Sequence, residues 1–278
     1  ATMGNAAVWN LLMTAWSYEN DLAIPHPDEI ENFSGGLARC YKKGYTKRLV
    51  KIDYASLYPM IQLTHDVFPI FDISGVIKKM LTYLTTTRNI YKKLAAEKKL
   101  KDSEVELLKT LDNETYHKYV NDSFTKEERN LFKVKQLPIK ILNNSLFGAL
   151  GSGFAFNWSD NICAARITTT GRLYLRKAID FFKNYGLDPL LAVTDGVNFG
   201  VPNTTTIRIT DEGINEGVNE GMIEEMWQYK GEVGIGALIE YFNDKHMPKP
   251  YMLVDNDGEF ESCLNLSRIN YALKTPKK

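Results

Sequence analysis

Apolar residues recur at helical spacing in several parts of the chain. The clearest run begins at Val76 and continues to about residue 100, and the charged stretch 101–130 is expected to turn the chain back as a helical hairpin. Further helices are predicted at 4–18, 140–147, 160–184 and 223–243. Glycines indicate where two of them end, with Gly148 and Gly151 after the helix at 140–147 and Gly186 after the helix at 160–184.

Alternation of apolar and polar residues predicts strands between these helices. Residues 48–53 combine alternation with β-branched side chains, and 190–193 and 197–201 flank an Asp-Gly pair that favours a β-hairpin. Residues 251–273 are strand-like, whereas 202–222 are expected to form a loop or insertion. Helices inserted between the strands of an antiparallel sheet predict the α+β class.

The composition is that of an ordinary globular protein. The 278 residues are 44% hydrophobic and 24% charged, and no apolar run reaches the roughly 20 residues that cross a bilayer. Residues 1–17 show no secretory signal, and the widely spaced cysteines predict neither a disulfide framework nor a zinc site. We therefore expect an intracellular protein that has no membrane partner.

The formal net charge is zero, but the charges are unevenly distributed. Lysine and arginine are concentrated in residues 78–140, whereas 211–225 contains acidic residues and no basic one. A polyanion responds to the local potential rather than to the net charge. The neutral total therefore does not exclude a nucleic-acid partner.

Two aspartates are candidates for a metal site. Asp53 ends a predicted strand just before a tight turn, and Asp195 lies at the tip of the predicted hairpin. Read singly, Asp53 is a strand-ending acid that caps a turn, and Asp195 is an ordinary Asp-Gly turn residue. Read together, two strand-tip carboxylates that are remote in sequence are the usual protein share of a Mg²⁺ site that phosphates and water complete.

Two helices each carry polar side chains one turn apart. Lys140 and Asn144 share a helix face, and Arg88 and Lys92 have the same spacing. Such faces suit a triphosphate, because arginine grips phosphate with two hydrogen bonds and lysine acts as a point charge. The alternative interpretation of Arg88 and Lys92 is a solvated helix face.

Several segments, in order along the chain, resemble motifs of the family B DNA polymerases. DYASLYP at 53–59 resembles motif A (DxxSLYP), KILNNSLFG at 140–148 resembles motif B (KxxxNSxYG), and VTDGVNF at 193–199 resembles motif C (DTDS followed by a strand). FSGG at 33–36 is similar to the YxGG/A motif, and RINYAL at 268–273 is similar to the KKRYAL segment. The resemblance covers roughly residues 10–273.

This resemblance implies a polymerase palm, which is a small antiparallel sheet backed by helices, and a helical fingers hairpin. The palm would comprise residues 1–74 and 148–278, and the fingers would comprise residues 75–147. The implied activity is template-directed DNA synthesis, in which two metal ions assist transfer of a nucleotide from a dNTP to a primer 3′-hydroxyl. Primer–template DNA and dNTPs are the implied partners, and Mg²⁺, for which Mn²⁺ can substitute, is the implied cofactor.

The same resemblance implies roles for individual residues. Asp53, Asp195 and the backbone carbonyl of Tyr54 would hold the ions, and Lys140 would assist the leaving group as a catalytic residue. The expected nucleotide-binding residues are Ser56, Leu57, Tyr58, Arg88, Lys92, Lys140, Asn144 and Phe147. The expected DNA-binding residues are Gly35, Gly36, Thr194, Arg268 and Tyr271. Among these, Tyr58 would reject ribonucleotides through collision of its ring with a 2′-hydroxyl.

Several positions depart from the family pattern. Val193 replaces the first aspartate of motif C, Gly196 replaces a serine, and Phe147 replaces a tyrosine. Ile269 and Asn270 replace basic residues, so weaker DNA binding with a lower salt dependence is expected. The valine leads us to expect lower activity or a changed metal preference.

Segments typical of a 3′–5′ exonuclease and of a thumb are not evident in the sequence. The chain is therefore expected to be a fragment, one half of a split polymerase with a second chain as partner, or a minimal form. The expected location is the cytoplasm of a bacterial or phage-infected cell, or another compartment that holds DNA. Two alternatives stay open: a polymerase-like scaffold that binds nucleic acid without catalysis, and a nuclease that uses the same two-ion chemistry.

Overall fold

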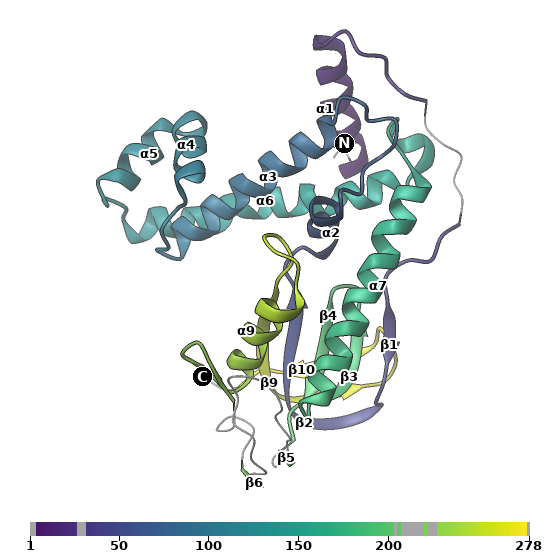
Figure 1. Ribbon diagram of the computed structural model, residues 1–278, viewed down its shortest axis with the longest axis vertical. Helices are drawn as coiled ribbons and strands as arrows, with labels where there is room; N and C mark the ends of the chain where they lie inside the picture. Colours follow the sequence, from purple (N-terminus) through teal and green to yellow (C-terminus); the bar gives the residue numbers. More distant parts are fainter. Residues whose placement is uncertain (1–3, 27–31, 203–204, 207–219, 222–226, 277–278) are drawn as a thin grey trace. The chain divides into compact units, whose positions relative to one another are not determined.

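A computed structural model describes residues 4–26, 32–202, 205–206, 220–221 and 227–276. Helices and antiparallel strands are both present in this part of the chain, which agrees with the predicted α+β class (Figure 1). The chain divides into two compact units, one formed by residues 1–32 and 67–164 and the other by residues 33–66 and 165–278. The names palm and fingers for parts of these units stay predictions.

The first unit is helical. Figure 1 shows two long helices, α3 and α6, that run alongside each other, with the shorter α4 and α5 at one end of the pair. Its elements are α1 (Asn5–Glu19), α3 (Val76–Ala95), α4 (Asp102–Leu111), α5 (Asn113–Val120), α6 (Lys126–Leu150) and the short 3-10 helix η1 (Gly153–Ala155). The predicted hairpin at 101–130 therefore corresponds to α4, α5 and the start of α6.

Local chemistry explains where these helices begin and end. The Thr125 hydroxyl accepts a hydrogen bond from the Glu128 amide and the Glu128 carboxylate accepts one from the Thr125 amide, so a capping box starts α6. This helix is longer than the predicted 140–147, and Gly148 lies inside it, whereas Gly151 is its C-cap. The helix predicted to reach residue 100 ends at Ala95, because Glu97 adopts a left-handed φ of 57°.

Buried contacts hold the helices of this unit together. An apolar cluster of Ile90, Leu94, Leu108 and Phe132 joins α3, α4 and α6. The Asn143 side chain donates to the Thr85 hydroxyl at 3.2 Å in a buried hydrogen bond between α6 and α3. Trp9, which is fully buried, donates its indole N–H to the Leu142 carbonyl of α6 at 3.0 Å.

The second unit is built on a six-stranded antiparallel sheet with the order β1-β3-β4-β2-β9-β10. The strands are β1 (Ala38–Cys40), β2 (Gly44–Tyr54), β3 (Asp188–Val193), β4 (Gly196–Gly200), β9 (Val254–Asn265) and β10 (Tyr271–Lys274). Helices α2 (Leu57–His65) and α9 (Ile235–His246) and most of α7 (Asn161–Asn184) belong to the same unit. The predicted strand at 48–53 and the predicted hairpin at 190–201 are confirmed.

Aromatic packing attaches helices to this sheet. The ring of Phe182 on α7 lies 5.5 Å from that of Phe199 on β4 and 5.3 Å from that of Phe242 on α9, measured between centroids. All three side chains are fully buried. Burial of such rings is a major contribution to core stability, so this cluster fixes α7 and α9 against the sheet.

The segment before α9 corrects one prediction. A helix was expected at 223–243, but the described residues 227–234 contain the short strands β7 (Gln228–Tyr229) and β8 (Glu232–Val233), and the helix begins at Ile235. Positive φ values at Lys230, Gly231 and Gly234 explain why the helix does not begin earlier. Most of the predicted loop 202–222 lies outside the described residues, apart from the two-residue strands β5 (Thr205–Thr206) and β6 (Glu220–Gly221).

Among the described helices, none is both long enough and apolar enough to cross a membrane.

Asp112, the N-cap of α5, gives a pH-dependent test of how this helix is stabilised. Asp112 accepts hydrogen bonds from the Thr115 amide at 3.0 Å and hydroxyl at 2.6 Å. Burial raises the pKa of Asp112, but these hydrogen bonds and the Lys135 ammonium outweigh it, so the pKa lies below the ordinary 3.8. The ionised carboxylate therefore stabilises the fold above the unfolded-state pKa, and this contribution is lost as the pH falls through the folded-state pKa.

We expect Asp112→Ala to lower the free energy of unfolding by about 1 kcal/mol at pH 7, and Asp112→Asn to lower it less, because asparagine also caps helices. The advantage of the native protein over Asp112→Asn should shrink as the pH falls from the ordinary pKa of 3.8 through the lower pKa of the folded state. Urea unfolding followed by circular dichroism measures both effects. Asp102→Ala, an exposed acid in the first turn of α4, is the control. Equal losses for Asp112→Ala and Asp102→Ala would contradict the assigned cap.

Candidate active site

The structure brings Asp53 and Asp195 to neighbouring positions. Asp53 is the last residue but one of β2, and Asp195 lies in the tight turn between β3 and β4. The Tyr54 amide donates a hydrogen bond to the Asp195 carbonyl at 2.8 Å, which ties the turn to the end of β2. Thr194 has a left-handed φ of 56°, which makes this turn tight enough to place Asp195 beside β2.

Gly196 leaves the space that the Asp53 carboxylate occupies. The two residues are paired across β2 and β4. A Cβ atom at Gly196 would overlap Asp53 Oδ1, which is buried. The glycine that replaces the serine of the motif is therefore required here by the position of the carboxylate.

The turn after Asp53 positions the tyrosine that was expected to contact the sugar. Ser56 adopts a left-handed φ of 57° and precedes α2, in which Leu57 is buried and Tyr58 is half-buried. Burial and the nearby Asp195 carboxylate raise the pKa of Tyr58, and Arg172 lowers it in part. The Tyr58 hydroxyl therefore stays protonated at neutral pH.

Two glycines lie against Tyr58. A Cβ atom at Gly36 would lie 2.7 Å from the Tyr58 hydroxyl oxygen and 3.4 Å from Thr194 Cα, and one at Gly171 would lie 3.2 Å from the Tyr58 ring. Gly36, Tyr58 and Thr194 are thus together beside Asp195. Gly171 was not predicted, because a glycine inside a helical pattern carries no sign of what it contacts.

Arg172 also belongs to this group and was missed by the sequence analysis. Its guanidinium donates hydrogen bonds to the carbonyls of Ser34 and Gly35, both at 2.6 Å. It therefore fixes the loop that carries Gly35 and Gly36. One arginine on a helix that contains further basic residues has no distinguishing feature in the sequence.

A third acid, Asp255, lies next to Asp53. The two residues are paired across β2 and β9, and the Asp255 side chain is exposed. In the described part of the chain, no group of three or more His, Cys, Asp or Glu side chains is arranged to hold a metal ion. Two half-buried carboxylates, Asp53 and Asp195, are nevertheless a donor set that suits Mg²⁺, because this ion usually keeps waters and phosphate oxygens among its ligands and rarely occupies an all-protein cage.

The expected phosphate-binding residues lie in the helical unit. Arg88 on α3 donates from Nε to the Gln136 side-chain oxygen on α6 at 3.0 Å, and its partial burial lowers its pKa. Gln136 is one turn before Lys140, so Arg88 reaches the helix that carries Lys140. The sequence analysis missed Gln136. Lys92, Lys140 and Asn144 are exposed, and Phe147 is half-buried.

The remaining candidates lie near the end of the chain. Arg268 is exposed in the turn between β9 and β10, and Tyr271 is the first residue of β10. Tyr271 pairs with Asn265 and is 40% exposed. The structure thus brings Gly36, Asp53, Tyr58, Thr194 and Asp195 together in the sheet unit, and it joins Arg88 to the Lys140 helix in the helical unit.

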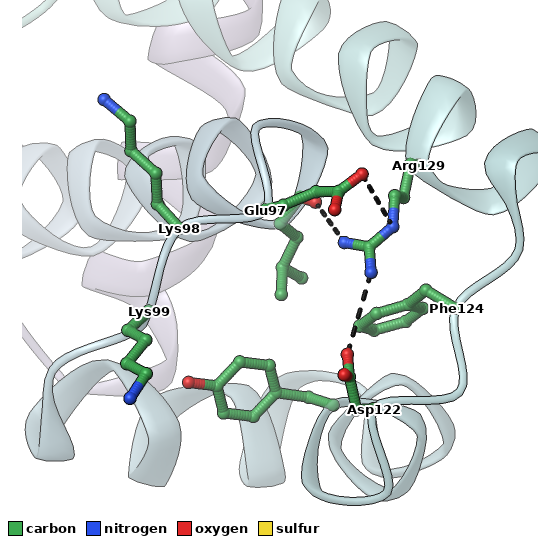
Figure 2. A pocket seen from close by; sticks show the side chains of 8 residues that line it. Glu97, Lys98, Lys99, Asp122, Phe124 and Arg129 are labelled. Carbon is green, nitrogen blue, oxygen red and sulfur yellow. Dashed lines mark hydrogen bonds and ion pairs between the residues drawn. The ribbon is translucent and has the colours of Figure 1, made fainter.

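A pocket of about 350 Å³ lies in the helical unit. Figure 2 shows the side chains that line it. The Arg129 guanidinium forms ion pairs with Glu97 and Asp122 at 3.4 and 3.7 Å, while Lys98 and Lys99 point away from it. The pocket lining consists of Leu94, Glu97, Lys98, Lys99, Tyr119, Asp122, Phe124 and Arg129. None of the predicted site residues belongs to this lining. Through its ion pairs and a hydrogen bond to the Leu94 carbonyl, Arg129 on α6 links this helix to α3 and to the segment after α5.

Comparisons with known proteins agree with the motifs. A family model described as DNA polymerase family B matches residues 5–204. DNA polymerase 1 of Pyrococcus abyssi is 27% identical over 93% of this chain and 33% of its own length. The DNA polymerase of Desulfurococcus sp. (strain Tok) is 29% identical over 73% of this chain and 26% of its own length. The chain thus spans about a third or less of the curated relatives it matches.

A solved structure shows a similar fold. The family B DNA polymerase from the hyperthermophilic archaeon Pyrobaculum calidifontis aligns with a TM-score of 0.59. The alignment covers 98% of this chain and 32% of that chain at 16% sequence identity. At that identity the similarity concerns the fold.

The glycine opposite Asp53 gives a test of the candidate metal site. We expect Gly196→Ala to weaken Mn²⁺ binding by at least about tenfold, which is about 1.4 kcal/mol, because the new Cβ displaces the Asp53 carboxylate. Electron paramagnetic resonance of bound and free Mn²⁺ measures the affinity.

Gly200→Ala is the matched control on the same strand, since a Cβ atom there would make only ordinary contacts of 3.4 Å or more. Thermal unfolding of both variants confirms that they are folded. Equal Mn²⁺ affinities for the two variants would remove Asp53 from the metal site.

Proposed function

Because the chain belongs to DNA polymerase family B, we propose that it carries out template-directed DNA synthesis. The reaction is transfer of a nucleotide from a dNTP to the 3′-hydroxyl of a primer paired to a template. Primer–template DNA and dNTPs are then its partners, and it acts in a compartment that holds them. The observation that carries this proposal is the hydrogen bond between the Tyr54 amide and the Asp195 carbonyl, which keeps Asp195 beside Asp53.

The carboxylates of Asp53 and Asp195 and the carbonyl of Tyr54 are the proposed metal ligands. A pair of divalent ions, Mg²⁺ or in its place Mn²⁺, would supply activation of the primer hydroxyl and charge neutralisation of the triphosphate. The chain contributes fixed positions for these oxygens. Asp53 and Tyr54 lie at the end of β2, which is paired on both sides, and the turn with Asp195 is hydrogen-bonded to that end, so little reorganisation is needed when substrate arrives.

Backbone amides and cationic side chains are proposed to bind the triphosphate. The backbone amides of Ser56 and Leu57 lie at the start of α2, and the positive end of a helix dipole favours an anion. Arg88, Lys92 and Lys140 supply positive charge to the β- and γ-phosphates. Gln136 holds the Arg88 side chain in place, and Lys140, which is exposed, can deliver a proton to the leaving pyrophosphate.

Sugar and base selection are assigned to three side chains. Tyr58 is held against Gly171 and Gly36, so its ring has little freedom to move away from a 2′-hydroxyl. Asn144 and Phe147 lie one turn apart on α6 and are proposed to line the nascent base pair. Gly35, Gly36, Thr194, Arg268 and Tyr271 are proposed to contact DNA. In this interpretation residues 75–147 act as fingers and residues 1–74 and 148–278 act as palm.

Single-nucleotide incorporation onto a primer–template tests the proposal. In Mg²⁺ at low salt we expect extension by the templated nucleotide alone. Asp53→Ala and Asp195→Ala should each slow extension by at least about a thousandfold, which is about 4 kcal/mol in the barrier. Denaturing gel electrophoresis of a labelled primer measures the rate.

Asp188→Ala removes an exposed acid at the start of β3 in the same sheet and serves as control. Failure of the unaltered chain to extend a primer that it binds would favour a polymerase-like scaffold without catalysis. Shortening of the labelled strand without dNTPs would favour a nuclease.

Tyr58 gives a second test, which concerns sugar selection. We expect Tyr58→Ala to raise the efficiency of ribonucleotide incorporation relative to deoxyribonucleotide incorporation by at least about tenfold, because removal of the ring removes the collision with the 2′-hydroxyl. Competition between rCTP and dCTP opposite a template guanine measures the ratio. Tyr58→Phe keeps the ring and should keep the discrimination; an unchanged ratio in Tyr58→Ala would remove Tyr58 from the sugar site.

A further inference from the structure

Lys51 lies on the same side of β2 as Asp53. Side chains alternate along a strand, and Val50, Ile52 and Tyr54 are buried. The Tyr54 hydroxyl donates to the carbonyl of Tyr174 on α7 at 2.8 Å, so this set faces the helix. Lys51 and Asp53 therefore face the other side of the sheet, about 6.7 Å apart along the strand.

A β-bulge places an acid beside Lys51. Lys51 pairs with Gly258 and Ile52 pairs with Asn256, so Asp257 is the extra residue of β9. Gly258 has a φ of 134°, which other residues rarely adopt. The result is an ion pair between Lys51 Nζ and an Asp257 carboxylate oxygen at 2.5 Å.

The ion pair keeps the ammonium group at the surface of this face. The Lys51 side chain is 28% exposed and that of Asp257 is 51% exposed. An ammonium has three donors. If Asp257 accepts one, two remain for another acceptor.

We propose that Lys51 binds the backbone phosphate between the last two nucleotides of the primer strand. This inference rests on the proposed function, in which Asp53 marks the position of the primer 3′-hydroxyl. The phosphate on the 5′ side of the terminal nucleotide lies one sugar away from that hydroxyl, a separation that the spacing between Lys51 and Asp53 matches.

The surroundings of Lys51 support a role in DNA binding. The segment that begins at Arg268 continues with Ile269 and Asn270, which carry no charge. Lys51 supplies a cation on the face of the sheet that carries Asp53. The bulge at Asp257 also supports a functional role for Lys51, because β-bulges often occur next to active sites, where they change the direction of a side chain.

The first experiment measures DNA binding without turnover. Fluorescence anisotropy of a labelled primer–template, without dNTP, gives the affinity of the full chain at several salt concentrations. Lys51→Gln should weaken binding about tenfold at low salt and should make the slope of log affinity against log salt shallower by about 0.7 to 0.9, the loss of one phosphate contact. Lys51→Arg should retain the slope.

Lys230→Gln is the matched control. Lys230 also forms an ion pair with an acid, Asp244, at 2.8 Å, but it lies in the turn between β7 and β8, outside the six-stranded sheet that carries Asp53. Its loss should leave the salt slope unchanged. If Lys51→Gln and Lys230→Gln change affinity and slope equally, the proposal is overturned.

A neutral phosphate identifies the contact. Replacing the phosphate between the last two primer nucleotides by a methylphosphonate should weaken binding of the unaltered chain, but should not further weaken binding of Lys51→Gln, because the two changes remove the same interaction. A methylphosphonate placed six nucleotides upstream should affect both proteins equally. Additive losses at the terminal phosphate would overturn the assignment.

A purely structural role of the ion pair makes a different prediction. If the ion pair has only a structural role, Asp257→Asn and Lys51→Gln should have the same effect on DNA binding. If Lys51 contacts a phosphate, Asp257→Asn should keep the salt slope of the unaltered chain, because the ammonium remains. Failure of the proposed function is recognised separately, because anisotropy needs no catalysis. An unaltered chain that binds but does not extend the primer leaves the Lys51 test intact, and one that does not bind at all contradicts both proposals.

Discussion

The hydrogen bond from the Tyr54 amide to the Asp195 carbonyl is the interaction on which the candidate active site depends. It continues the pairing of β2 with β4 by one step, so the position of Asp195 relative to Asp53 is set by backbone geometry rather than by side-chain packing. Gly196 follows from the same constraint. Antiparallel pairing places it directly opposite Asp53, where only a hydrogen atom leaves room for the carboxylate.

The helical unit holds its polar residues in a different way. Side chains rather than strand pairing fix α6, through the buried hydrogen bond of Asn143 to Thr85 and the indole N–H of Trp9 at the Leu142 carbonyl. Arg88 is held by Gln136, whereas Lys140 is exposed and keeps its side-chain freedom. The two candidate cations thus differ: Arg88 is fixed by a neighbour on α6, whereas Lys140 is open to solvent.

The sequence was sufficient for elements whose signal is local. Strand 48–53, the hairpin around Asp195 and the helices α1 and α7 follow from periodicity and turn residues, and the motif resemblance agrees with the family match over residues 5–204. Contacts between distant segments were not predictable. The pairing of Asp53 with Asp255 depends on the register of β9, and the contact of Arg88 with Gln136 depends on how α3 packs on α6. The late start of α9 was missed because the helical pattern before Ile235 concealed a glycine turn.

Acidic side chains gather around Asp53 at this end of the sheet. Asp53 and Asp255 are directly paired across β2 and β9, and Asp195 lies in the turn that is hydrogen-bonded to the end of β2. Lys51 and Asp257 compensate each other through their ion pair, so they leave the excess negative charge with Asp53, Asp195 and Asp255. Val193 stands where the motif has a further aspartate, so this position adds no negative charge. Such a group of carboxylates would suit a divalent cation whose remaining ligands are phosphate oxygens, because Mg²⁺ is usually held by one or two carboxylates together with phosphate and water rather than by protein ligands alone.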